Sequence, residues 1–294
     1  MKQIDQFIIE KLILNKQSKL ASNDDVNNNN SNKPQTKKEL RKIIEDRLSK
    51  DKNADFTDID VSNITDMEKL FYGLDPHNIN ISNWDVSEVT NMSWMFAECR
   101  DFNSNISKWT PIKVTNMVSM FYGCYKFNQD LNDWDVSKVV NMGHMFHDCY
   151  NFNKSLNNWK TKKVIQMPAM FANCTKFNQD LNDWDVSEVY NMQSMFSGCI
   201  NFNGNISDWK LDNIENMNYM FSNCKKFNCD IRKWDVSNAT TMQWMFLGCE
   251  SFDYDLSEWP IRNTTIMGMF TGCTMLKKHR GILRKNKIPK WYKP

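Results

Sequence analysis

The chain has 294 residues, of which 41% are hydrophobic, and its formal net charge is +2. A charge so near zero gives no whole-protein field that would attract nucleic acid or an anionic membrane surface. The hydrophobic fraction is sufficient for a continuous core, and 19 Met, 18 Phe and 11 Trp make that core rich in large side chains.

The beginning of the chain divides into two segments of different composition. Residues 1–16 carry apolar side chains near helical spacing and predict an amphipathic N-terminal helix, which packs on the first repeat or contacts a membrane or partner. Residues 17–35 are rich in Asn and predict a disordered linker. Glu10 and Lys11 interrupt the apolar run, and neither a signal peptide nor a lipobox is recognisable. We therefore expect no transmembrane segment and an intracellular protein.

Residues 36–58 change character and predict an N-terminal capping helix. Thr36 is a favourable N-cap residue at its start. An apolar stripe follows at Leu40, Ile43, Ile44 and Leu48. Terminal units of a stacked array need such a cover to stay soluble.

Residues 59–276 contain a repeat of 25 residues. Its clearest marker is a Trp column, in which Ile59 holds the first place: Trp84, Trp109, Trp134, Trp159, Trp184, Trp209, Trp234 and Trp259. A fixed period in the twenties is typical of a solenoid built by stacking one small unit. The sequence therefore predicts about nine stacked units.

Each unit predicts one short helix. Asn91 and its equivalents are N-cap residues, and Met92, Met95, Phe96 and Cys99 follow at i, i+3, i+4 and i+7. The residue just before each Cys stands where a helix of two turns would end, and in this column Gly, Asn and Asp, which tolerate a left-handed backbone, predominate: Glu98, Gly123, Asp148, Asn173, Gly198, Asn223, Gly248 and Gly272.

Each unit also predicts one short strand, around Ile106 and Trp109. The expected fold class is thus an α/β repeat, a leucine-rich-repeat-like solenoid with one parallel strand and one helix per unit. Strands stack at about 4.8 Å and helices at about 8–10 Å, so the sheet should line a concave side. The spacing predicts that the last unit has lost one residue within Met267–Phe270. Residues 277–294 hold eight Lys or Arg and no acid, and predict a basic C-terminal cap or tail.

The consensus Trp-Asp-Val-Ser-x-Val-x-Asn-Met-x-x-Met-Phe-x-x-Cys-x-x-Phe-Asn-x-Asp-Leu resembles the BspA-like leucine-rich-repeat family, whose repeats occur in mycoplasma lipoproteins and bacterial surface proteins. The resemblance covers residues 33–294, with a similar cap in Lys33–Leu40 and a similar end in Ile288–Lys293. It implies a solenoid without catalytic residues that serves adhesion or protein contact, and it makes a cell-surface location possible.

Two groups of residues suggest metal sites at first sight. One Cys per unit, from Cys99 to Cys273, is better interpreted as core filling, because a metal site needs several converging ligands. Cys229 falls outside that column, and we expect it to be exposed and reactive. His144 and His147 form a pair in one unit only, and a solvated helix face is the favoured interpretation. We expect no metal and no cofactor.

The residue after each Trp alternates between acid and base through the middle of the array. We expect Asp135, Lys160, Asp185, Lys210 and Asp235 to face one another across coils and to fix the register. The surface around them is the predicted partner-binding strand face, formed by Asn132, Asp133, Asp135, Lys160, Asp183, Asp185, Lys210, Lys233 and Asp235.

The functional prediction is a non-catalytic repeat protein that acts as a protein–protein interaction module. The alternative is a surface adhesin or a structural component of a cell surface or particle. No phosphate-binding loop or nucleophile motif is present in the sequence, so we do not expect an enzyme. The partner is expected to be a protein of unknown identity, and nucleic acid has one candidate contact, the basic tail at 277–294.

Overall fold

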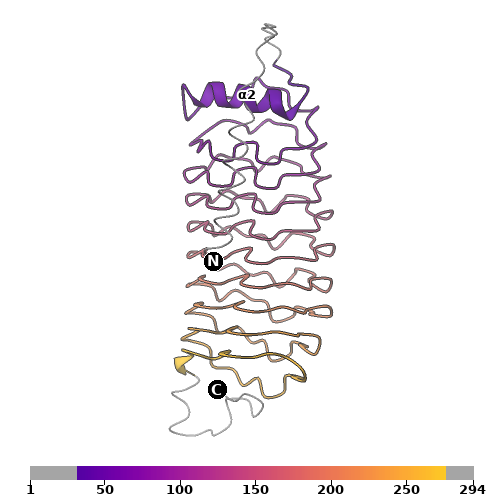
Figure 1. Ribbon diagram of the computed structural model, residues 1–294, viewed down its shortest axis with the longest axis vertical. Coiled ribbons are helices and arrows are strands. Elements are labelled where there is room, and N and C mark those ends of the chain that lie inside the picture. The colour runs from indigo at the N-terminus through magenta and orange to yellow at the C-terminus, as the bar shows by residue number, and fades with distance from the viewer. Residues whose placement is uncertain (1–31, 276–294) are drawn as a thin grey trace, which may run out of the picture. The chain divides into compact units, whose positions relative to one another are not determined.

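The computed structural model describes residues 32–275. The predicted helix at 1–16, most of the predicted linker and the basic tail at 277–294 lie outside these residues. Helix α2 spans Lys37–Leu48 and lies across one end of the stacked coils (Figure 1). Thr36 is its N-cap, and the Thr36 side chain accepts a hydrogen bond from the Glu39 N–H at 3.2 Å. Leu40, Ile44 and Leu48 of α2 are buried in the same core as the coils.

The coils contain turns where the sequence predicts helices. Between residues 49 and 273 the chain forms no α-helix. The Met95 N–H donates to the Met92 carbonyl at 3.2 Å, and the Cys99 N–H donates to the Phe96 carbonyl at 3.0 Å. These bonds close successive β-turns, in which the contacts repeat every three residues and so imitate a helical apolar pattern.

Four N–H groups of this segment donate to the neighbouring coil. Those of Met92, Trp94, Phe96 and Glu98 donate to carbonyls of the next coil at 2.7–3.0 Å. An α-helix would direct the same groups to its own carbonyls four residues back. The N–H groups that would form helical hydrogen bonds therefore donate between coils, and a ladder of inter-coil hydrogen bonds replaces the predicted helices.

Apart from one bridge between Asp55 and Asn80, parallel pairing occurs in a different column from the one predicted. The bridges join Asp66, Asn91, Asn116, Asn141, Gln166, Asn191, Asn216, Thr241 and Thr265 in succession. The predicted strand around Trp109 is instead a turn, since the Trp109 N–H donates to the Ile106 carbonyl at 3.1 Å. The predicted concave sheet is not supported either, because no helices separate the coils between residues 49 and 273.

The side chains of the Asn column nevertheless accept hydrogen bonds from backbone N–H groups, as a helix N-cap would. The Asn91 Oδ1 accepts from the Ser93 N–H at 3.1 Å, and the Asn116 Oδ1 accepts from the Val118 N–H at 3.1 Å. A cap side chain makes the same kind of bond to a backbone N–H at the start of a helix. Here it stabilises an Asx-turn.

Two columns have a left-handed backbone. The column predicted to end the helices is one, with φ between 60° and 62° at Glu98, Asp148, Asn173 and Asn223. The second was not predicted, and its non-glycine φ values lie between 50° and 59°: Lys69, Trp94, Ser119, His144, Ala169, Ser194, Tyr219 and Trp244. A left-handed conformation costs a residue with a Cβ roughly 1–2 kcal/mol. The stacked core must outweigh that strain in almost every coil.

The core is a set of side-chain ladders that run along the stack. Trp159 is fully buried, and its Nε1–H donates to the carbonyl of Leu131, 28 residues earlier, at 2.8 Å. Its indole stacks on Trp184 with 6.0 Å between ring centroids. A Phe ladder runs beside it with successive centroids 5.0–5.7 Å apart: Phe71, Phe96, Phe121, Phe146, Phe171, Phe196, Phe221, Phe246 and Phe270.

The missing residue of the last unit lies earlier than predicted. The bridge from Thr241 to Thr265 spans 24 positions, whereas Trp234 and Trp259 are still 25 apart. The deletion therefore falls between Trp259 and Thr265 and not within Met267–Phe270. In agreement, Met267 is 61% exposed and does not belong to the buried Met column.

Candidate partner-binding surface

The predicted binding residues lie in the turns that flank the Trp column, not on a strand. Asn132 is half-buried, and the other eight are exposed. Consecutive coils are tied together along this edge. The Asn132 Oδ1 accepts from the Asn158 N–H at 3.1 Å, and the Asn182 Oδ1 accepts from the Asp208 N–H at 2.9 Å. The residues do share one edge of the stack, but some of them hold the coils in place.

The alternating charges do not form the predicted ladder of ion pairs. Within residues 32–275, no ion pair joins Asp135, Lys160, Asp185, Lys210 or Asp235. Each of the three aspartates accepts instead from the Ser N–H two residues on, at 2.9–3.1 Å. For Asp185, the hydrogen bonds of Ser187 lower the pKa, and the charges of nearby lysines lower it further. These acids stabilise turns within their own coil.

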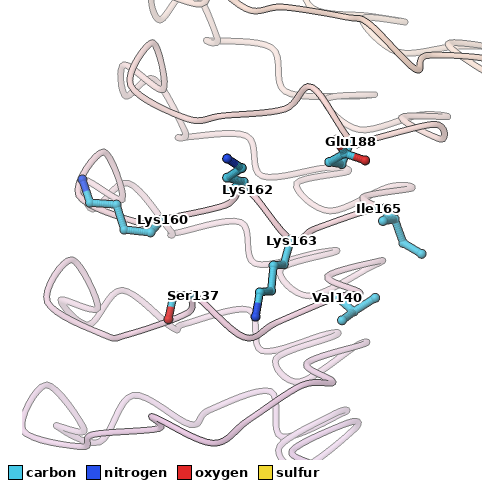
Figure 2. A pocket seen from close by; sticks show the side chains of 7 residues that line it. All are labelled: Ser137, Val140, Lys160, Lys162, Lys163, Ile165 and Glu188. Atoms are coloured by element: carbon cyan, nitrogen blue, oxygen red, sulfur yellow. The ribbon is translucent and has the colours of Figure 1, made fainter.

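A depression of about 570 Å³ lies on this edge (Figure 2). Its lining residues come from three consecutive coils: Ser137, Val140, Lys160, Lys162, Lys163, Ile165 and Glu188. Figure 2 shows Lys160, Lys162 and Lys163 on the middle coil and Glu188 on the next. We refer to this set of seven residues as the lysine depression.

The lysine depression combines positive charge with exposed apolar surface. Lys160, Lys162 and Lys163 are all exposed, and none forms an ion pair with another described residue. Val140 is 37% exposed. Of the predicted face, only Lys160 belongs to this site. The missed lysines could have been found from the departure of Lys160-Thr-Lys-Lys163 from the Asp-Val-Ser pattern of neighbouring units.

The cysteines of the repeat are buried and are not joined by disulfides, as the core-filling interpretation requires. The Cys174 Sγ–H donates to the Phe146 carbonyl at 3.0 Å, and burial raises the pKa of this thiol. The prediction for Cys229 is wrong. Cys229 is 9% exposed and belongs to the buried core, and burial raises the pKa of its thiol.

The prediction of a solvated histidine face is also wrong. His144 and His147 are half-buried, and their Nδ1 atoms lie 3.2 Å apart. Burial lowers the pKa of His144 to about 4 and also lowers the pKa of His147, so both rings are uncharged at neutral pH. The backbone at His144 is left-handed, with φ of 59°, and the His144 ring stacks on that of His147 with 5.5 Å between centroids.

Asp75, His77 and Asp101 form a group whose ligand atoms lie within 4.8 Å of one another. An ammonium group already engages it, since the Lys126 Nζ lies 2.7 Å from an Asp101 carboxylate oxygen. The Asp101 N–H donates to Asp75 at 3.2 Å. These contacts account for the cluster as a polar network between neighbouring coils.

Among the described residues, no helix combines the length and the apolarity needed to cross a membrane. A search of curated proteins found no match. One similar solved structure is a leucine-rich-repeat protein of T. pallidum, with 14% sequence identity and a TM-score of 0.37. That similarity covers 59% of this chain and 74% of the other, and a score of that size carries no argument about function.

The family described as "Mycoplasma protein of unknown function, DUF285" matches three overlapping stretches, residues 38–149, 112–199 and 180–282. Together they include the capping helix α2 except for its first residue, and every complete coil. A match over more than half of the chain, on a backbone of stacked 25-residue coils, establishes that this repeat protein belongs to the DUF285 family.

Proposed function

We propose that the chain is a non-catalytic repeat module that binds a protein partner, and that an acidic segment of the partner occupies the lysine depression. The observation that carries the proposal is the set of three exposed lysines without ion pairs, arranged beside the apolar surface of Val140 and Ile165. Interfaces combine an apolar centre with charges that steer the partner and select it.

The absence of catalysis is part of the proposal. Each conspicuous column of the repeat has a structural role, since the Trp and Cys side chains donate hydrogen bonds to the preceding coil and the Asn and Asp side chains close turns. The same roles leave the exposed edges free to vary between coils. Repeat scaffolds use such edges as extended binding surfaces.

The experiment is affinity capture from the native source with the full chain, comparing wild type with a Lys160→Glu, Lys162→Glu, Lys163→Glu variant. We expect the variant to lose a partner that the wild type retains, with affinity for the purified partner reduced by at least about tenfold. The matched control reverses three other exposed lysines without described ion pairs, in Lys154→Glu, Lys176→Glu, Lys226→Glu. Equal capture by all three proteins, or equal loss in both variants, would refute the proposal.

The finer assignment to BspA-like repeats, and with it the alternative of a surface adhesin, is a second candidate. It is supported by the Trp-Asp-Val-Ser consensus and by membership of a family that is described from Mycoplasma. Surface biotinylation of intact cells tests it. Labelling of the chain without lysis supports a surface role, and protection until lysis, with an intracellular marker as reference, counts against it.

A further inference from the structure

A second surface, built around Gly123, combines two carboxylates with aromatic rings. Glu98, Gly123 and Asp148 occupy the same left-handed column on three consecutive coils. Gly123 contributes no side chain there, and a Cβ on it would lie 3.3 Å from the Glu98 Oε1. The Glu98 carboxylate therefore extends over Gly123, toward the coil that carries Asp148.

Aromatic side chains flank this column along the chain on both sides. Tyr122, just before Gly123, lies with its ring centroid 5.9 Å from Trp94 and 4.9 Å from His147. Tyr125, two residues after Gly123, stacks on Tyr150 at 4.8 Å. Trp94, Tyr122 and Tyr125 are partly exposed, and Tyr150 is 38% exposed. We name Glu98, Gly123 and Asp148 with these flanking rings the acidic aromatic site.

Among residues 32–275, no Lys or Arg forms an ion pair with either carboxylate of this site, although the charge of Arg100 acts on Glu98. Within residues 32–275, Glu98 forms no ion pair, and Asp148 has His147 at 3.8 Å as its one basic neighbour within ion-pair distance. Burial lowers the pKa of His147, so that ring is a weak counter-charge at neutral pH. Burial also raises the pKa of Glu98, the positive charge of Arg100 opposes that rise, and the negative charge of Asp148 adds to it.

A guanidinium group of the chain itself already stacks on one ring of this site. Arg100 lies over the ring of Tyr125, with 5.5 Å between its Cζ and the ring centroid. Arg232 stacks on Tyr254 in the same way at 5.4 Å. The scaffold thus already pairs guanidinium groups with tyrosine rings at two exposed positions.

We propose that the acidic aromatic site binds an arginine side chain of a protein partner. A guanidinium group is planar, stacks on aromatic rings and donates paired hydrogen bonds to a carboxylate, so it matches each component of the site. A lysine ammonium would satisfy the charge but has no flat surface for the rings. This inference concerns a different surface from the lysine depression and does not depend on an acidic partner binding there.

The test uses the full chain and a fluorescein-labelled peptide of alternating glycine and arginine. Binding is measured by fluorescence anisotropy at an ionic strength of about 0.15 M. A peptide with citrulline in place of arginine keeps the shape and removes the charge. We expect saturable binding of the arginine peptide, and a loss of at least about tenfold in affinity in a Glu98→Gln, Asp148→Asn variant. Both substitutions preserve side-chain size at left-handed positions, and urea midpoints verify that the variant folds.

The matched control, Asp133→Asn with Asp183→Asn, makes the same change of net charge at two exposed positions on the other edge. It should bind the arginine peptide within about twofold of wild type. Absence of saturable binding to wild type, equal losses in both variants, or equal binding of the citrulline peptide would overturn the inference. The variant with the three lysine reversals should retain the arginine peptide, which separates this outcome from failure of the proposed function.

Discussion

Ser194 and Ser197 lie in the same coil but differ in backbone conformation, so replacement of Ser by Gly can be compared at the two positions. Ser194 has φ of 57°, whereas Ser197, three residues later, is not left-handed. Both are half-buried. Replacing Ser194 with Gly relieves a left-handed strain of about 1–2 kcal/mol and adds about 0.5–1 kcal/mol of unfolded-state entropy. We therefore expect Ser194→Gly to stabilise the fold by about 0.5–1 kcal/mol.

The same change at Ser197 has only the unfavourable contribution. Ser197→Gly should destabilise the fold by about 0.5–1 kcal/mol, so the two variants should differ by roughly 1–2 kcal/mol in free energy of unfolding. Urea unfolding followed by Trp fluorescence measures the difference, with the denaturant slope checked for each variant because stacked repeats can lose two-state behaviour. Two variants that shift the midpoint in the same direction by the same amount would refute the reasoning about strain.

Two further predictions concern titratable groups. All nine thiols, including Cys229, should resist iodoacetamide in the folded chain at mildly alkaline pH and react only on unfolding. The reason is that burial raises the pKa of a thiol or blocks access of the reagent to it. Rapid labelling of Cys229 in the folded chain would contradict its burial. Burial lowers the pKa of His144 from 6.5 to about 4, so the unfolded chain binds more protons in that window and stability should fall as pH drops from about 6.5 to 4. His144→Asn, which keeps a residue tolerant of the left-handed backbone, should flatten that slope in urea midpoints; an unchanged slope would assign the pH dependence to other groups.

Spacing alone identified the repeat and most of its buried columns. Trp159, Cys174 and Phe121 recur at a period of 25 and are buried, because a stacked unit must place the same side chain in the core of each coil. The left-handed column that contains Gly123 could also be recognised, since Gly, Asn and Asp share a tolerance for positive φ. The N-cap at Thr36 followed from its residue type and position.

The sequence pattern could not separate a helix from a run of β-turns. Met92, Met95, Phe96 and Cys99 satisfy both, because turns closed by three-residue hydrogen bonds and a helix of 3.6 residues per turn place nearly the same positions on one side. The choice depends on where the intervening N–H groups find acceptors. That acceptor lies 24 residues away along the chain, on the next coil.

In the candidate sites too, some residues can be recognised from their own unit, whereas others are brought together only by the stacking of coils. Lys160 was recognisable from its own unit, but the hollow between Val140 and Glu188 exists only because three coils come together. Glu98 and Asp148 are 50 residues apart, and the bare backbone of Gly123 brings them to one surface. Residue types and their period thus determined the core and the repeat, while the stacking of coils decided the backbone hydrogen bonds and the surfaces available to a partner.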